Sequence, residues 1–272
     1  MKTRVISAAI GITVVLTILI LSQTLTALIA TTLLSFVTVM MTSEALNAKK
    51  LMKDITISPV CIMVSFTMPM LSFTRFWFVP FFAFIVAVLC IMVFFHETVK
   101  LENIAYAFFT TTIISVGMSS ITMLSTTYDK YCAFFIVLTM ATPWIADAGA
   151  YFVGINFGKH KLCPKISPKK TVEGAVGGLI TGCISAIFIG LIFDFMFGYI
   201  YLNYWALAII GLINTPLSML GDLSFSIIKR TLGIKDYGNV IPGHGGMLDR
   251  FDSVVVTAPL VYVVTLFTVI II

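Results

Sequence analysis

Charged residues are scarce in this chain of 272 residues, which holds only 17 Lys and Arg and 12 Asp and Glu side chains. A soluble domain of this size needs more polar surface than so few charges supply. The five cysteines lack the paired spacing of a zinc or redox motif, so neither disulfides nor structural zinc is expected. The N-terminal apolar run lacks the small-residue cleavage site of a signal peptide, so we expect it to remain as a first membrane span.

Apolar residues are abundant instead. They make up 59% of the chain, and its mean hydropathy is +1.07. A helix needs about 20 mostly apolar residues to cross a bilayer. The predicted fold is therefore an all-α polytopic membrane protein with about nine transmembrane helices, near 5–21, 24–41, 56–73, 76–95, 103–122, 132–153, 174–198, 203–221 and 254–272.

Basic residues are distributed unevenly over the loops between these predicted spans. With a cytoplasmic N-terminus, only Arg75 and Lys130 fall outside, and the other basic residues fall on the cytoplasmic side. Such a bias is typical of the positive-inside rule. The net charge of +5 is therefore interpreted as topology and attraction to anionic membrane lipids, and no nucleic-acid partner is expected.

The two halves of the chain differ in character. The spans within 1–125 are joined by short loops and carry little charge, so this part is predicted to be a scaffold for lipid access or oligomer contacts. The part 126–272 contains two polar segments, 154–173 and 222–253, which fall on one face of the predicted topology. Cations and glycines in both segments predict a catalytic region with a polar cavity open to the cytoplasm.

Charged and hydroxyl residues open the second polar segment at helical spacing. If the eighth helix continues past the membrane, Asp222, Ser226 and the pair Lys229-Arg230 lie on one of its faces. A carboxylate there can hold a divalent ion, and the cations can bind phosphate oxygens that the ion leaves free. The pattern favours a metal–phosphate site.

A glycine-rich loop, GNVIPGHGG, follows that helix. Glycine backbone can present N–H groups to an anion, so Gly245 and Gly246 are candidate phosphate contacts, with His244 between glycines beside them. A glycine-rich loop is by itself a weak signal, because glycines also serve ordinary turns.

Two closely spaced aspartates end the second polar segment. Asp249 and Asp252 are three residues apart and could share a metal ion. Equally, they could pair with Arg250 and Lys235 and cap a helix. The residues alone leave both options open.

The stretch SPKKTVE in the first polar segment also suits phosphate contact. Its hydroxyls and cations are Ser167, Lys169, Lys170 and Thr171. Glu173, just after them, could be a charge at a helix N-terminus, a metal ligand, or both.

Two further features of the C-terminal half stand out from its apolar background. Asp147 lies late in the sixth predicted span, where an acid is costly and indicates a functional site with a partner. Gly174, Gly178 and Gly182 share one helical face, which predicts close helix packing within the chain or, less favoured, a dimer contact.

These motifs together resemble one family. The run SFSIIKRTLGIKDYGNVIPGHGGMLDRFD over 224–252 closely resembles the C-terminal signature of the phosphatidate cytidylyltransferases, also called CDP-diacylglycerol synthases. Upstream, ADAGAYFVGINFGKHKLCPKISPKKTVEG over 146–174 is similar to the second block of that family. Both blocks lie in the C-terminal half of the chain.

The resemblance implies transfer of CMP from CTP to phosphatidic acid in the plasma membrane of a bacterium, with the active site facing the cytoplasm. It implies Mg²⁺ as cofactor, with room for a second cation, monovalent or divalent, and a homodimer is a further option. The implied metal ligands are Asp147, Asp222, Asp249 and Asp252, and the implied catalytic residues are Asp222, Asp249, Lys229 and Arg230. The implied substrate contacts are Ser167, Lys169, Lys170, Thr171, Ser226, Lys235, His244, Gly245, Gly246 and Arg250.

Two alternatives remain open. A related CTP-dependent lipid enzyme, such as a CDP-archaeol synthase or a polyprenol kinase, faces the same problem of joining CTP to a membrane substrate. A transporter of anionic solutes would place its charges at mid-membrane depth in several spans, whereas the first five predicted spans contain almost none.

Overall fold

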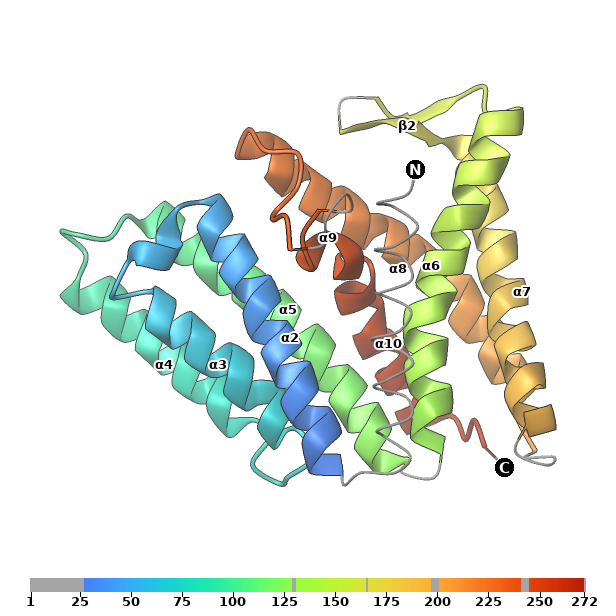
Figure 1. Ribbon diagram of the computed structural model, residues 1–272, viewed down its shortest axis with the longest axis horizontal. Helices are drawn as coiled ribbons and strands as arrows, with labels where there is room; N and C mark the ends of the chain where they lie inside the picture. Colours follow the sequence, from blue (N-terminus) through green and yellow to red (C-terminus); the bar gives the residue numbers. More distant parts are fainter. Residues whose placement is uncertain (1–26, 129–130, 165, 197–200, 241–244, 272) are drawn as a thin grey trace. The chain divides into compact units, whose positions relative to one another are not determined.

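The computed structural model describes most of the chain, namely residues 27–128, 131–164, 166–196, 201–240 and 245–271. The first predicted span, 5–21, lies outside the described residues. The chain divides into two compact units, the first Met1–Cys132 with Leu232–Phe251, and the second Ala133–Thr231 with Asp252–Ile272. Each unit is built almost entirely of helices (Figure 1).

The first unit packs its helices around α3. Its elements are α2 (Ala27–Ala48), a short 3-10 helix (Leu51–Lys53), α3 (Ser58–Leu71), α4 (Val79–Phe94), α5 (Leu101–Thr127) and α9 (Leu248–Phe251). Helix α3 contacts α2, α4 and α5, and the four share a buried apolar core. The rings of Phe84 and Phe108 stack in this core with centroids 5.4 Å apart. Buried serine and threonine hydroxyls accompany this apolar core, and those of Thr42 in α2 and Ser65 in α3 lie 2.8 Å apart.

The second unit joins four helices and a hairpin. Its elements are α6 (Cys132–Phe157), β1 (Lys161–Cys163), β2 (Ser167–Thr171), α7 (Val172–Met196), α8 (Tyr204–Thr231) and α10 (Val254–Phe267). Strands β1 and β2 pair in antiparallel fashion, with Lys161 opposite Thr171, and the hairpin lies at one end of α6 and α7 (Figure 1). The predicted all-α class is confirmed, and the short hairpin, which the sequence analysis did not predict, pairs backbone groups that a bare connecting loop would leave to water.

The glycine face of α7 packs within the chain. A Cβ atom at Gly174 would lie 2.6 Å from the carbonyl oxygen of Ala150 in α6, and one at Gly178 would lie 3.1 Å from that of Ala146. A Cβ atom at Gly182 would meet the Thr215 hydroxyl of α8 and would lie 3.4 Å from the carbonyl oxygen of Gly211 in the same helix. The glycines therefore allow α7 to approach both α6 and α8 at backbone distance, which confirms the expectation of intrachain packing.

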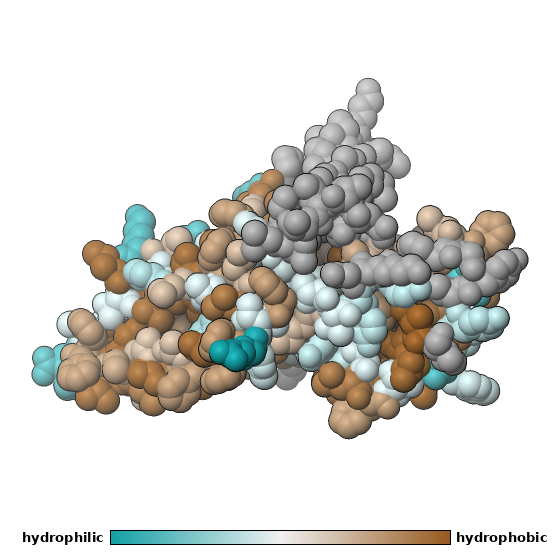
Figure 2. All heavy atoms as spheres, turned by 90° about the horizontal axis from the view of Figure 1, so that it is seen from below, coloured by the Kyte–Doolittle hydropathy of each residue, from teal (hydrophilic) through white to brown (hydrophobic). Residues whose placement is uncertain are grey.

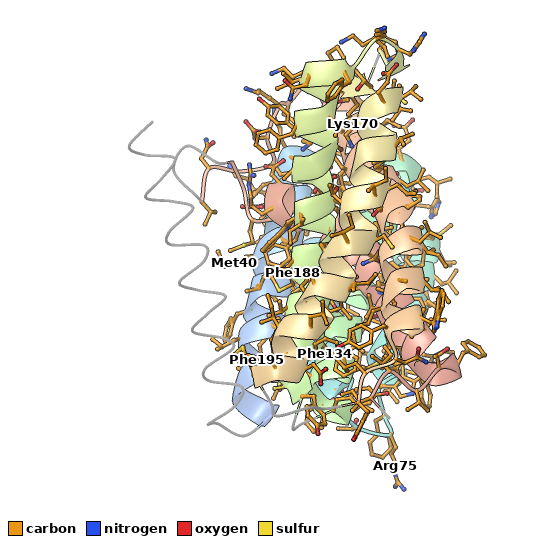
Figure 3. All side chains as sticks on the ribbon, turned by 90° about the vertical axis from the view of Figure 1, so that its right-hand side faces the viewer. Met40, Arg75, Phe134, Lys170, Phe188 and Phe195 are labelled. Carbon is orange, nitrogen blue, oxygen red and sulfur yellow. The ribbon has the colours of Figure 1, made fainter. Side chains whose placement is uncertain are left out.

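The opposite face of α7 is apolar and exposed. Val176, Ile180, Ile184 and Phe188 follow one another every four residues on this face, and Phe195 extends the row. Figure 3 shows Phe188 and Phe195 along α7, and Figure 2 shows hydrophobic side chains over much of the visible surface. Such a stripe on a helix of 25 residues is what lipid contact requires.

Four of the described helices, α5, α6, α7 and α8, are long and apolar enough to cross a membrane. Helices α3, α4 and α10 are apolar too but have only 14, 16 and 14 residues. At 1.5 Å per residue these three reach about 21–24 Å, short of the roughly 30 Å hydrocarbon core. These apolar helices are those of a membrane protein, and the full count of nine spans stays a prediction.

The close approach of α7 and α8 generates a test. A Cβ atom at Gly211 would lie 2.6 Å from the Cα of Cys183 and 2.7 Å from the carbonyl oxygen of Gly182, so backbone has to move. Gly211→Ala should therefore destabilise the protein by about 1–3 kcal/mol. Denaturant unfolding in detergent measures this, with Ile213→Ala, on an exposed part of α8, as the control expected within about 0.5 kcal/mol of wild type. Equal stability of Gly211→Ala and wild type would contradict the packing described.

Candidate functional site

Three aspartates from separate elements gather in the second unit. Asp147 comes from α6, Asp222 from α8, and Asp252 lies two residues before the start of α10. The Asp147 and Asp252 carboxyl groups each interact electrostatically with that of Asp222 and with one another. Three like charges at such range repel each other, so the arrangement requires cations.

Two lysines supply those cations. The Lys170 Nζ lies 2.6 Å from Asp222 Oδ2, and the Lys229 Nζ lies 3.9 Å from Asp252 Oδ2. Lys170 belongs to strand β2, and Figure 3 shows it at the hairpin end of α6 and α7. The hairpin therefore brings a cation from the first polar segment to the carboxylate of the second.

Helix α8 continues past the predicted span to Thr231, which meets the condition under which the sequence placed Asp222 and Ser226 on one face. Its continuation places the Ser226 hydroxyl one turn from Asp222, and this hydroxyl donates to Asp222 Oδ1 at 3.3 Å. Asp222 thus interacts with a lysine through one carboxylate oxygen and with a hydroxyl through the other.

Gly221 explains how Asp252 reaches this cluster. A Cβ atom at Gly221 would lie 2.8 Å from the carbonyl oxygen of Asp252, so only glycine lets α8 pass this close. Asp252 is buried, and its Oδ1 accepts the backbone N–H of Ser253 at 2.8 Å. Burial raises the pKa of the Asp252 carboxyl and the charge of Asp222 raises it further, whereas Lys229 lowers it.

Buried polar groups that the sequence analysis missed continue the cluster along α8. Asn214 and Ser218 precede Asp222 by two turns and one turn, and both side chains are buried. Among the described residues, neither side chain forms a hydrogen bond of ordinary geometry, although Ser218 lies beside Asp147. Asn214, Ser218 and Asp222 follow one another at intervals of four residues, and this spacing is the sequence signal that could have found the first two.

The donor set suits a Mg²⁺ ion. Within the described part of the chain, no three His, Cys, Asp or Glu side chains already form a cluster with metal-ligand geometry. Mg²⁺ does not need one, because it is usually bound by one or two carboxylates together with water and substrate phosphates. Asp222 and Asp252, now held by lysines, offer carboxylate oxygens of the right kind.

The other predicted aspartate, Asp249, lies in the first unit and holds the glycine-rich loop. Its Oδ2 accepts the backbone N–H of Tyr237 at 2.8 Å and that of Gly246 at 2.9 Å. Gly245 has a left-handed backbone with φ 86°, which explains the need for glycine there. The N–H of Gly246, predicted to contact phosphate, thus binds a carboxylate in this structure.

Other predicted contacts have local structural partners or lie on the surface. The Thr171 hydroxyl accepts the Gly174 N–H at 3.1 Å and so caps α7. Lys169 and Lys235 are exposed, as are Arg230 and Arg250, which have further interactions in the structure. Ser167 pairs with Cys163 across the hairpin, and His244 lies outside the described residues.

Glu173 has a structural role of its own. Its carboxylate accepts the backbone N–H groups of Lys159 and His160 and lies 2.6 Å from the His160 ring. Glu173 lies in the first turn of α7, so it is the charge at a helix N-terminus that the sequence suggested. Its carboxylate also holds the connection between α6 and β1.

The amino-acid sequence is similar to those of known proteins. A family model described as the cytidylyltransferase family matches residues 2–268. The chain is 40% identical over 134 residues to the phosphatidate cytidylyltransferase of Bacillus subtilis, covering 49% of this chain and 48% of the relative. It is 45% identical over 128 residues to that of Synechocystis, covering 46% of this chain and 41% of the relative. The matched stretches span about half the length of these relatives, and the family model spans nearly the whole chain. By this match the chain belongs to the cytidylyltransferase family.

Proposed function

We propose that this protein transfers CMP from CTP to phosphatidic acid, giving CDP-diacylglycerol and pyrophosphate. The observation that carries the proposal is the contact of Lys170 with Asp222, because it joins the two polar segments into one cluster of alternating charge. The family match and the names of the relatives support the same reaction.

The chemistry brings two polyanions together. A phosphate oxygen of phosphatidic acid attacks the α-phosphorus of CTP and forms a new P–O bond. The bond from that phosphorus to the oxygen bridging to the β-phosphorus breaks, and pyrophosphate leaves with the electron pair. An anionic phosphate has no proton that must be removed, so no general base is assigned. The catalytic contribution is positioning and charge neutralisation.

The lysines would neutralise the substrates. Lys170 and Lys229 already lie beside carboxylates, and phosphate oxygens are alternative partners of the same charge. The remaining proposed substrate contacts keep the roles that the resemblance implies for them.

A bound Mg²⁺ would supply positive charge to the phosphate oxygens at this site. We propose that Asp222 and Asp252 hold it, with Asp147 as a supporting acid and Asp249 as a further ligand on the basis of the resemblance. We also propose a second cation, monovalent or divalent, on the basis of the same resemblance.

The cellular arrangement is also a proposal. Nine spans, a cytoplasmic N-terminus and a cavity open to the cytoplasm of a bacterial plasma membrane are supported by the positive-inside bias. The division into a scaffold, 1–125, and a catalytic region, 126–272, and the option of a homodimer rest on the sequence alone.

The reaction itself can be tested with purified protein in detergent, phosphatidic acid, Mg²⁺ and CTP. Cytosine label should appear in the lipid and pyrophosphate should be released, and chelation of Mg²⁺ should stop both. Label from the γ-phosphate in the lipid would indicate a lipid kinase instead. Solute flux in proteoliposomes without CTP, and no labelled lipid, would favour a transporter.

Asp249→Asn tests the proposed metal ligand. The asparagine carbonyl can still accept the Tyr237 and Gly246 N–H groups, so the loop should keep its fold while the charge is lost. Turnover should be abolished, with membrane insertion and thermal stability close to wild type. Arg75→Ala, far along the sequence from the signature, is the control expected to keep turnover. Full activity of Asp249→Asn would remove Asp249 from the site.

Lys170→Met tests the charge balance of the cluster without any activity assay. Removing this half-buried cation leaves the aspartates to repel one another, which should cost about 1–3 kcal/mol of stability in chelator. Because Mg²⁺ can replace the lost charge, it should restore more stability to this variant than to wild type. Lys169→Met, its exposed neighbour, should show neither effect. An equal response to Mg²⁺ in all three proteins would argue against a cation site here.

A further inference from the structure

In addition to Asp249, a carboxylate from the N-terminal half of the chain binds the end of the glycine-rich loop. Glu44 lies near the end of α2, and its side chain is buried. Its Oε1 accepts the backbone N–H of Met247 at 2.9 Å, and its Oε2 accepts that of Leu248 at 2.8 Å. These partners lie 203 and 204 residues further along the chain, within the same compact unit.

Burying this carboxylate is costly unless hydrogen bonds compensate it. Charge-assisted bonds to two backbone N–H groups offset part of this cost, and both come from the residues that directly follow the loop. The contact therefore stabilises the loop and the Glu44 charge together. Loss of either would leave buried polar groups without partners.

Two glycines of the loop make room for Glu44. A Cβ atom at Gly246 would lie 2.5 Å from Glu44 Oε2, and one at Gly238 would lie 2.6 Å from Oε1. The carboxylate is fixed by its two hydrogen bonds, so it cannot swing away without losing them. Glycine at these positions is thus explained by a carboxylate packed against the backbone.

Glu44 and Asp249 divide consecutive N–H groups of the loop between them. Asp249 binds the N–H of Gly246, and Glu44 binds those of Met247 and Leu248. Asp249 directly follows these residues as the second residue of the short helix α9, so the position of its carboxylate follows from that of the backbone before it.

We propose that Glu44 is a positioning residue, which holds the loop so that Asp249 stands ready for the reaction. The expected effect of Glu44 on activity rests on the proposed function, whereas its expected effect on hydrogen exchange of the loop does not. Glu44 lies outside both signature blocks, in the part of the chain predicted to be a scaffold.

Glu44→Gln provides the first test. One amide oxygen cannot replace two carboxylate oxygens, and its NH₂ group would face a backbone N–H. We expect kcat to fall about 10–100-fold and the Mg²⁺ concentration for half-maximal rate to rise, as when a residue behind a metal ligand is changed. Glu97→Gln, an exposed residue of the α4–α5 connection, should match wild type in both. Wild-type kinetics in Glu44→Gln would overturn the proposal.

A paired substitution separates positioning from general damage. Gly246→Ala should lower activity because its methyl group displaces the Glu44 carboxylate. Glu44→Asp alone should also lower activity, since the shorter side chain cannot reach both N–H groups. The double variant should be more active than Gly246→Ala alone, because the shorter acid leaves room for the methyl group. If the activity lost in the double variant equals the sum of the losses in the two single variants, in free-energy terms, the contact between Glu44 and Gly246 is contradicted.

Hydrogen exchange gives a readout that needs no substrate. The amides of residues 246–248 should exchange faster in Glu44→Gln than in wild type, while those of α5 should not change. Unchanged exchange in 246–248 overturns the inference even where the enzyme is active. If the wild-type protein makes no CDP-lipid but these amides still exchange faster in Glu44→Gln than in wild type, the proposed function is refuted and the contact is established. If Glu44→Gln does not accumulate, Gly246→Ala is measured in the same way.

Discussion

The ion pair between Lys170 and Asp222 is the interaction on which the second unit depends. Charges at the end of an apolar bundle have little water to solvate them, so each needs a partner of opposite sign. Asp222 also faces the charges of Asp147 and Asp252, which makes the lysine necessary even before substrate binds. Strand β2 carries Lys170, and the hairpin is therefore part of the electrostatics of the site as well as a connection.

Glycine geometry makes that cluster possible. Carboxylates on three elements come within interaction range only because the helices behind them approach at backbone distance, at Gly178 and Gly182 of α7 and at Gly221 of α8. A methyl group at any of these positions would meet a neighbouring helix or the Asp252 backbone. Small residues thus set the separation of charges that lie elsewhere in the sequence, which links membrane helix packing directly to the chemistry.

Local patterns made part of this site predictable. Helical spacing correctly placed Ser226 one turn from Asp222, and four-residue spacing correctly identified the packing face of α7. Contacts between residues far apart in the sequence could not be predicted from such spacing. No local signal connects Glu44 with Met247, and the pairing of β2 with β1 depends on backbone groups rather than on a side-chain pattern. Asn214 and Ser218 did carry a signal, but it is visible only once Asp222 is taken as the reference point.

In the glycine-rich loop, the contacts in the structure differ from those that the sequence motif suggests. Glycine followed by glycine suggests N–H groups open to an anion, yet here the N–H groups from Gly246 onward bind Asp249 and Glu44. A phosphate arriving at those donors would meet two carboxylates of its own sign. Direct phosphate contact by Gly246 stays a prediction, and it requires one carboxylate to withdraw. The simpler physical role of these glycines is to let two acids reach the backbone, so that the loop delivers a correctly placed aspartate.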